Sequence, residues 1–535
     1  MRQPRERVAR IGRHRRDYKS SDSQEPAAGF GRGWAILTWF MTGPIADTFD
    51  RISSQHRNRI AVYGLSEGVT RTFAELRDDV SALEDALCAL HLPSPPTIIA
   101  NVGNRTGFIP LFLASVGLGS SFLPLDGGAS AREVLDLADV SGADLVVVPA
   151  EAAAFRSMAP APLPCGLWAI VRRRTRDPSW RAPHETDALI LKVTSGSTGP
   201  PRLAVTAEES LVADGRHVID AMAIETNDVS VATVPMAHAY GMGNLLLPLL
   251  LKGSPVVLRD RFVHGQWASD VKQYGVTMFP GVPFIFDYLR RVGAAASPLG
   301  GIRLVVTAGA PIDFQTVEYF KQHFNVKIHS LYGTTETGSI TYDASDGLSD
   351  RVSVGWPMPE TTVALAPSSD FDSGGRILVQ GSAVSRGYAD GDALDDASPA
   401  FTAAGFLTAD LGRWAADGQL ILLGRTSRFV NVAGRKVNPG EVERVIAELP
   451  DVVQVWVMGV PNERRGQDLI ACVSRRTAEL SAASIRTHCA ITLSPHKVPR
   501  RIVFADAVPL TGRGKTSRQT LEALLNASPD REDSL

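Results

Sequence analysis

The chain has 535 residues, of which 44% are hydrophobic and 21% are charged. These proportions are typical of folded globular proteins and exclude the disordered, collagen-like and coiled-coil classes. At about 150 residues per unit, the length suggests roughly three or four structural units. The 55 Lys and Arg residues nearly balance the 57 Asp and Glu residues. The chain therefore offers no overall positive field for a nucleic-acid backbone, and we expect no nucleic-acid partner.

The cysteines and the longest apolar run also limit the function. Cys88, Cys165, Cys472 and Cys489 form no C-x-x-C pair, so neither a zinc site nor a redox site is predicted. We expect four buried, reduced thiols and a cytoplasmic location. The apolar run at residues 245–251 contains a proline and is shorter than the ~20 residues that span a bilayer. No transmembrane segment is predicted.

Residues 1–40 differ in composition from the rest of the chain. Arginine is frequent in the first half, a polar stretch follows, and a short apolar run covers residues 34–41. We expect a disordered basic tail of unknown role, with the folded protein beginning near Met41. A transit peptide is the weaker alternative, because Glu6 and Asp17 are acidic and no small-residue cleavage site is found.

Strand-like apolar runs alternate with helix-length segments from the end of this tail to about residue 331. Strands are predicted at residues 97–100, 145–148, 188–193, 229–234, 255–258, 276–279 and 304–307, and a helix at 109–117. This alternation predicts parallel α/β sheets.

Shorter strands and turns follow residue 351 and predict a small β subdomain, and a compact α+β unit ends the chain. The predicted elements are strands at 361–366, 375–380, 418–424, 453–460, 468–473 and 502–504, a helix from Pro439 and a helix near Ser484. The predicted fold class is α/β, with a large N-terminal domain and a small mobile α+β C-terminal domain. We expect these domains at residues 41–424 and 429–535, with a hinge at 425–428.

A loop of small hydroxylated residues follows the strand that ends at Val193. It reads Thr194-Ser195-Gly196-Ser197-Thr198-Gly199-Pro200-Pro201-Arg202. Such a loop lets backbone N–H groups and hydroxyls close around phosphate oxygens, and Arg202 adds a fixed positive charge. It does not fit the Walker pattern G-x-x-x-x-G-K-[ST], and a Ser/Gly turn without a ligand is the alternative.

Four further motifs follow in order along the chain. They are Tyr332-Gly333-Thr334-Thr335-Glu336, then Thr408-Ala409-Asp410, then Gly424-Arg425 leading into Gly434-Arg435-Lys436-Val437-Asn438-Pro439-Gly440-Glu441, and last Pro509-Leu510-Thr511-Gly512-Arg513-Gly514-Lys515-Thr516-Ser517-Arg518. In this order the motifs resemble those of the adenylate-forming superfamily, which includes acyl-CoA synthetases, adenylation domains of peptide synthetases, and luciferases. The resemblance runs from about Met41 to the C-terminus, and it is nearest to acyl-CoA and aryl-CoA ligases.

The resemblance implies a site for ATP. Its nucleotide-binding residues would be Thr194, Ser195, Gly196, Ser197, Thr198, Gly199 and Arg202 on the β- and γ-phosphates, Tyr332 stacked on adenine with Gly309, Ala310 and Gly333 nearby, Asp410 and Arg425 on the ribose, and Lys436. Thr335 would bond the α-phosphate, and Glu336 would hold Mg²⁺, which prefers carboxylate oxygen. Lys515 would bridge the substrate carboxylate and the α-phosphate. These last three residues are the implied catalytic groups.

The resemblance also implies a two-step reaction. A carboxylic acid would react with MgATP to give acyl-AMP and pyrophosphate, and a thiol would then take the acyl group. The C-terminal domain would rotate between the two steps about Ser427. Coenzyme A is the expected thiol, since the motif around Gly434 and the length favour it. An acyl carrier protein is the alternative acceptor, and a nucleotide-binding protein without turnover is the competing class.

The acid itself is less closely defined. No acidic residue lies between Ala237 and Asn244, which disfavours a free amino acid, because its buried ammonium would lack a partner. A fatty or aryl acid is expected instead. The expected pocket residues are His238, Tyr240, Leu331, Gly333, Ser339 and Ile340, with a satisfied core histidine as the alternative for His238. Similar acetyl-CoA synthetases carry Trp where Gly333 stands, so we expect an open pocket and an acid larger than acetate.

Overall fold

The computed structural model describes residues 43–172, 189–194, 202–260, 263–293, 301–348, 353–367, 374–389, 399–426, 430–432, 435–437, 439–462, 466–493 and 495–506. The predicted tail, the loop residues Ser195 to Gly199, the predicted pivot Ser427 and Lys515 lie outside these ranges.

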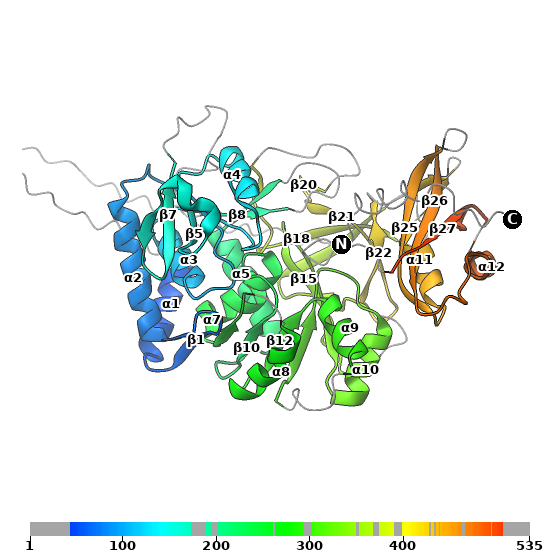
Figure 1. The fold of residues 1–535 in the computed structure, drawn as a ribbon, viewed down its shortest axis with the longest axis horizontal. Coiled ribbons are helices and arrows are strands. Elements are labelled where there is room, and N and C mark those ends of the chain that lie inside the picture. The colour runs from blue at the N-terminus through cyan, green and yellow to red at the C-terminus, as the bar shows by residue number, and fades with distance from the viewer. Residues whose placement is uncertain are drawn as a thin grey trace, which may run out of the picture. The chain divides into compact units, whose positions relative to one another are not determined.

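The helices are distributed along the whole described chain (Figure 1). They are α1 (Pro44–Gln55), α2 (Phe73–Ala89), α3 (Phe108–Gly117), α4 (Ala131–Val140), α5 (Glu208–Ala221), α6 (Ala239–Gly241), the π-helical turn η2 (Met242–Leu246), α7 (Leu247–Lys252), α8 (His264–Gln273), α9 (Pro283–Arg291), α10 (Phe314–Phe324), α11 (Pro439–Ala447) and α12 (Ala482–Thr492), with short 3₁₀ turns at Ala153–Met158 and Pro495–Lys497.

Two large sheets contain most of the strands. Sheet A runs in the order β16 (Trp356–Pro357), β15 (Gly338–Tyr342), β14 (Ile328–Thr334), β13 (Leu304–Thr307), β12 (Met278–Gly281), β10 (Ser230–Ala232), β11 (Val256–Leu258), β1 (Ile60–Gly64) and β2 (Val69–Thr72). Sheet B runs in the order β19 (Gly387–Tyr388), β9 (Leu203–Ala207), β8 (Leu189–Val193), β4 (Ser121–Pro124), β3 (Thr97–Ala100), β5 (Leu145–Pro149), β7 (Leu167–Val171) and β6 (Ala161–Leu163). The central strands of both sheets are parallel, as predicted.

Two smaller sheets follow. Sheet C runs in the order β17 (Thr361–Pro367), β18 (Gly375–Gly381), β21 (Gly405–Trp414) and β20 (Ala400–Thr402), and β22 (Leu420–Arg425) also pairs with β21. Sheet D runs in the order β24 (Arg435–Val437), β23 (Val430–Val432), β26 (Gly466–Arg475) and β25 (Val452–Asn462), and β27 (Arg501–Phe504) pairs with β26. Helices α11 and α12 share one apolar cluster with sheet D.

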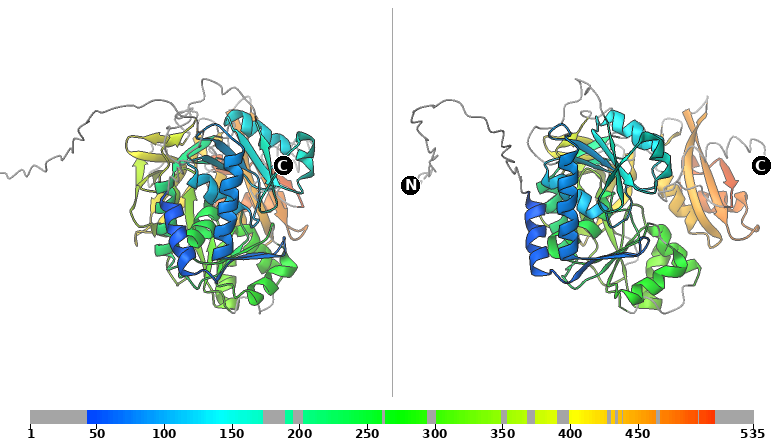
Figure 2. Two further views of the ribbon diagram at one scale, coloured as in Figure 1. Left: turned by 90° about the vertical axis from the view of Figure 1, so that its left-hand side faces the viewer. Right: turned by 60° about the vertical axis from the view of Figure 1, so that its left-hand side comes forward.

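Successive side chains of a strand point to opposite faces of a sheet, and helices pack on both faces of sheets A and B in three layers. Ile98 and Ala100 of β3 enter a cluster with α1, α2, α3, α5 and α7, whereas Ile99 enters a different cluster with α4. In the same way Val257 of β11 points away from this first cluster and toward α8, α9 and α10. Both faces of these strands are therefore covered, which explains why they read as continuous apolar runs. Figure 2 shows the two blue helices α1 and α2 running alongside each other within the shared layer.

The predicted strands agree with the structure, with local shifts. The strand at Leu304–Thr307 has the predicted bounds, but the strand predicted at 229–234 covers only Ser230–Ala232. Directly after Ala232 the backbone leaves the ladder, since Thr233 N donates to Val231 O at 3.1 Å and the carbonyl of Val234 accepts from Asn104 Nδ2 at 3.0 Å.

The prediction of four buried thiols is wrong for two of them. Cys472 and Cys489 are buried, Cys165 is partly buried and Cys88 is exposed, and all four are free. The buried stripe of α2 includes Leu83 and Leu87, and Cys88 lies beside it because neighbouring residues in a helix point in different directions. Among the described helices, none combines the length and the apolar character that crossing a bilayer requires.

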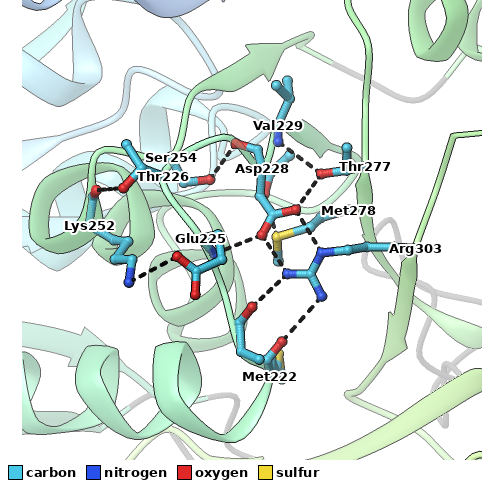
Figure 3. Close-up of polar contacts among 12 residues, drawn as sticks. Met222, Glu225, Thr226, Asp228, Val229, Lys252, Ser254, Thr277, Met278 and Arg303 are labelled. Carbon is cyan, nitrogen blue, oxygen red and sulfur yellow. Dashed lines mark hydrogen bonds and ion pairs between the residues drawn. The ribbon is translucent and has the colours of Figure 1, made fainter. Parts of the chain in front are cut away.

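A polar network lies at the amino ends of β10, β12 and β13 (Figure 3). Asp228 Oδ1 accepts from Thr277 Oγ1 at 2.8 Å and from Arg303 Nε at 2.7 Å. Its Oδ2 accepts from Glu225 N at 2.8 Å and from Arg303 Nη2. Burial alone would raise the pKa of Asp228, but these hydrogen bonds together lower it. The network ties the starts of three parallel strands together.

Candidate active site

The carboxyl ends of β12, β13 and β14 bring several predicted site residues to one edge of sheet A, where ligands bind in open α/β sheets. Gly309 and Ala310 follow β13 and are exposed. Gly309 has a φ of 88°, and apart from its chain neighbours no atom of the described residues lies within 4 Å of the position that a Cβ would take. The backbone there is open to a flat ligand, as the expected contact with adenine requires.

Tyr332, Asp410 and Arg425 form a connected group. Tyr332 on β14 donates its hydroxyl to Asp410 Oδ2 at 2.9 Å, and Arg425 Nε donates to Asp410 Oδ1 at 2.7 Å. The pairing of β21 with β22 places Asp410 directly opposite Arg425. Burial and the adjacent Asp410 raise the pKa of Tyr332, and the charge of Asp410 raises the pKa of Arg425. A carboxylate beside a half-exposed guanidinium suits the hydroxyls of a ribose.

Gly333 is a glycine because of a close backbone approach. A register shift in the β14–β15 pair follows Tyr332, and a Cβ atom on Gly333 would overlap the carbonyl oxygen of Gly338. This contact gives a backbone reason for the glycine, and the expectation that Gly333 leaves an acyl pocket open stays a prediction. A larger residue would have to displace the backbone of β15 before it reached any pocket.

Glu336 lies in the turn between β14 and β15 and is 7% exposed. Its Oε1 accepts from the hydroxyl of Tyr388 at 2.6 Å, and its backbone carbonyl accepts from Ser385 N at 2.7 Å. Oε2 accepts no hydrogen bond from the described residues, so the carboxylate keeps a free oxygen in a fixed position. This donor fits Mg²⁺, which takes one or two carboxylates and completes its shell with phosphate and water. Thr335, the neighbouring residue, is partly buried.

The base of the predicted phosphate loop lies close to this turn. Thr194 N donates to Arg202 O at 2.8 Å, and Arg202 N donates to Thr194 Oγ1 at 3.2 Å, so the two ends of the loop are joined. The Arg202 guanidinium stacks on the ring of Tyr388, 3.7 Å from its centroid. Tyr388 therefore contacts both Arg202, which is expected to bind phosphate, and Glu336, which is expected to bind Mg²⁺.

The predicted acyl-pocket residues are less closely grouped. Tyr240 is anchored, since its hydroxyl donates to Val306 O at 2.8 Å and to Gly281 O at 3.2 Å. His238 has 37% of its side chain exposed, 3.9 Å from the Asp126 carboxylate, so the core-histidine alternative is wrong. Leu331 and Ile340 belong to two different core clusters, and Ile340 is fully buried beside Tyr332.

Of three predicted residues in the C-terminal part of the chain, Lys436 lies within the described ranges, and of it only the backbone is described. Lys436 belongs to β24, opposite Asn431 of β23, and its side chain lies outside the described part of the structure. Lys515 and Ser427 lie wholly outside the described ranges.

Tyr388, Lys192 and Asp214 were not predicted from the sequence, although Lys192 and Asp214 each left a signal. Lys192 interrupts an apolar strand and is only 4% exposed. Asp214 lies between Leu211 and Val218 on the apolar face of α5 and is also 4% exposed. A charged residue at such a position is costly unless it has a partner, so each marks a specific contact.

Comparisons with known proteins show which family the chain resembles. Residues 49–389 match the family model of the AMP-binding enzyme, and residues 441–515 match that of the AMP-binding enzyme C-terminal domain. The sulfoacetate–CoA ligase of Cupriavidus necator is 30% identical over 348 residues, which are 63% of this chain and 68% of the ligase. The long-chain-fatty-acid–CoA ligase FadD13 of Mycobacterium tuberculosis is 24% identical over 480 residues, or 86% and 95% of the two chains.

Solved structures confirm the predicted fold class. ATP-bound MatB from Rhodopseudomonas palustris superposes with a TM-score of 0.77 at 22% identity, covering 90% of this chain and 99% of MatB. The o-succinylbenzoate coenzyme A synthetase MenE from Bacillus subtilis, in complex with ATP and a magnesium ion, superposes with a TM-score of 0.74 at 22% identity, covering 89% and 99%.

Proposed function

The chain belongs to the AMP-binding enzyme family, and we propose that it is an ATP-dependent acid–thiol ligase. In the first step a carboxylate oxygen of the acid attacks the α-phosphorus of ATP, and the bond to pyrophosphate breaks. In the second step a thiol attacks the acyl carbonyl carbon, and AMP leaves. Coenzyme A as the thiol is supported by the relatives, which carry the name of CoA ligases.

The observation that carries this proposal is the Tyr332–Asp410–Arg425 group at the carboxyl edge of sheet A. An aromatic ring next to a carboxylate suits an adenine and its ribose. The turn of Thr335 and Glu336 follows directly on β14, so the phosphates would lie beside the nucleoside. Positioning and charge neutralisation of this kind are what phosphoryl and nucleotidyl transfer chiefly need from a protein.

Each residue then has one task in the proposed reaction. Glu336 would hold Mg²⁺, which when bound neutralises charge on the phosphates. Thr335 would donate to the α-phosphate, and Arg202 with the loop from Thr194 would hold the outer phosphates. Lys515, which we expect from sequence alone, would bring the acid and the α-phosphate together.

The acid is proposed as a fatty or aryl acid, on the sequence argument above. The test is pyrophosphate release with MgATP across aryl, fatty and short polar acids, followed by thioester formation after coenzyme A is added. Reactions without acid and without Mg²⁺ are the controls. Release that depends on one acid class, followed by a CoA thioester, is expected. No release with any acid, in a protein that still binds AMP, would instead favour a nucleotide-binding protein without turnover.

Lys515→Ala gives a sharper version of the same test. Acyl-AMP formation should fall by roughly 10²-fold, the usual effect of removing one preorganised charged donor. Thioester formation from supplied acyl-AMP should change far less, because the bond to the α-phosphate has already formed. Equal losses in both half-reactions would contradict this role.

A cytoplasmic location also belongs to the proposal. It is supported by the four cysteines, all of which are free, as is usual where thiols are kept reduced. Cell fractionation with an antibody to the native protein would test it, and recovery from an oxidising compartment would contradict it.

A further inference from the structure

The turn that carries Glu336 is held from two sides. Tyr388 and Ser385 bind it on one side, as described above. On the other side Asp214 of α5 accepts from Ser339 N at 2.8 Å. A Cβ built on Gly338 would lie 2.6 Å from the carboxyl carbon of Asp214, so this carboxylate packs directly against the end of the turn.

Lys192 approaches the same turn from sheet B. Lys192 of β8 pairs with Ala204 of β9, and Ala204 pairs with Tyr388 of β19. Directly paired residues project from the same face of a sheet, so Lys192 and Tyr388 share a face with only the small Ala204 between them. Since Tyr388 binds Glu336 on this face, the ammonium group of Lys192 lies in the neighbourhood of Glu336.

The charges of this cluster are mutually dependent. Burial lowers the pKa of Lys192, and the carboxylates of Asp214 and Glu336 oppose that shift. Burial raises the pKa of Asp214, and the hydrogen bond from Ser339 N and the charge of Lys192 oppose it. Two buried carboxylates near one turn repel each other, and a buried ammonium that interacts with both offsets part of that cost.

We propose that Asp214 and Lys192 are positioning residues for Glu336. Asp214 fixes the end of the turn through Ser339 N, and Lys192 balances the charges of Asp214 and Glu336. The inference rests on the proposed function only in assigning Glu336 to MgATP. It predicts that damage to this cluster weakens binding of MgATP, which would use Glu336, far more than binding of AMP, which would use Tyr332 and Asp410.

The first experiment compares Asp214→Ala with Asp214→Asn. Dissociation constants for MgATP and for AMP without metal are measured by calorimetry, together with melting temperatures. Asp214→Ala should weaken MgATP binding by roughly 10-fold, the effect of losing one hydrogen bond to a charged group, and leave AMP binding nearly unchanged. Asp214→Asn should retain most MgATP affinity, because its amide oxygen can still accept from Ser339 N.

Asp144→Ala is the matched control. Asp144 is 7% exposed and accepts from Thr97 N at 2.9 Å, the same kind of contact at the start of strands in sheet B. This variant should lower the melting temperature without changing the ratio of the two dissociation constants. Equal weakening of MgATP and AMP in Asp214→Ala, or a changed ratio in Asp144→Ala, would overturn the positioning role.

The second experiment tests the charge balance. Lys192→Met alone leaves Asp214 and Glu336 without their common counter-ion and should weaken MgATP binding by roughly 10-fold. The double variant Lys192→Met with Asp214→Asn removes one charge of each sign and keeps the acceptor for Ser339 N, so it should recover most of that loss. A double variant no better than Lys192→Met would overturn the charge-balance part of the inference.

The two proposals fail differently in these experiments. A wild-type protein that binds MgATP but releases no pyrophosphate with any acid would contradict the proposed function, and the ratio of dissociation constants in Asp214→Ala would still decide the inference. A wild-type protein that releases pyrophosphate while Asp214→Ala binds MgATP as tightly would overturn the inference alone.

Discussion

Two buried aspartates near opposite edges of sheet A are each paired with an arginine, yet they differ in how many hydrogen bonds their carboxylates accept. Asp228, at the amino edge, accepts four hydrogen bonds, from Thr277, Glu225 N and two nitrogens of Arg303. Asp410, joined to the carboxyl edge through Tyr332, accepts two at its carboxylate. Since a carboxylate offers about four acceptor positions, Asp228 is saturated by the described protein groups and Asp410 is not.

The comparison shows how to tell a structural ion pair from a ligand site. The two arginines are exposed to a similar extent, 41% for Arg303 and 44% for Arg425. Exposure of the cation therefore does not distinguish them, but the unfilled acceptor positions of Asp410 do. Replacing Asp228 by asparagine should therefore lower the stability of the protein, whereas replacing Asp410 by asparagine should weaken nucleotide binding.

The largest expected effect is that of Asp228→Asn on stability. The new amide group would face donors that now bind the carboxylate; since Arg303 is 41% exposed, we expect weakening these hydrogen bonds to a charged group to cost about 3 kcal/mol. Urea denaturation should show this loss, while kcat/KM per folded molecule stays near the wild-type value. A variant as stable as the wild type would show that the network at the amino edge is not a structural anchor.

Asp410→Asn should act mainly on nucleotide binding. Losing the charge beside a ribose that takes two hydrogen bonds should lower kcat/KM for ATP by roughly 10- to 100-fold. Stability should fall less than in Asp228→Asn, because the amide oxygen can keep one of the two present partners. Steady-state kinetics at varied ATP, with denaturation curves for both variants, would check this, and an unchanged kcat/KM would remove Asp410 from the site.

The pH dependence of stability should separate the two edges further. Asp228 has a pKa below its usual value in the folded protein, so its contribution is fully present above the unfolded pKa of about 4 and is lost as pH falls through the folded pKa. The difference in unfolding free energy between wild type and Asp228→Asn should be constant from about pH 5 to 8 and shrink below about pH 4. Urea titrations at several pH values would measure it, and a difference that persists at low pH would contradict the assignment.

Tyr332→Phe should have the smallest effect. The ring would remain and only one hydrogen bond to Asp410 would be lost, at a cost of about 1 kcal/mol. KM for ATP should rise less than about 10-fold, and the melting temperature should move little. A loss as large as that of Asp410→Asn would mean that the hydroxyl, and not the ring, is what the nucleotide needs.

Elements with a strong local pattern could be predicted from the sequence. The run of residues 304–307 is apolar on both faces and gave its strand bounds directly. The motifs of Tyr332 and Asp410 were also identifiable, although their hydrogen bond was not. That bond depends on the position of β21 relative to β14, and no local sequence pattern predicts the relative position of two strands.

Contacts between strands could not be predicted in the same way. The sequence does not show that the Cβ position of Gly333 meets the backbone of Gly338 across a shifted register. The partnership of Lys192, Ala204 and Tyr388 exists only because β19, far along the chain, lies next to the consecutive strands β8 and β9 in sheet B. Long-range strand pairing of this kind has to be seen in the structure.

The hydrogen bond between Tyr332 and Asp410 joins residues 78 positions apart in the chain. It fixes the spacing between an aromatic surface and a carboxylate before any nucleotide is present. Two side chains that would otherwise lose rotational freedom on binding are already ordered, so the entropic cost of binding the proposed nucleotide would be small. A rigid nucleoside whose base and sugar match this spacing would make both binding contacts at once. A free base or a free sugar would make only one of them.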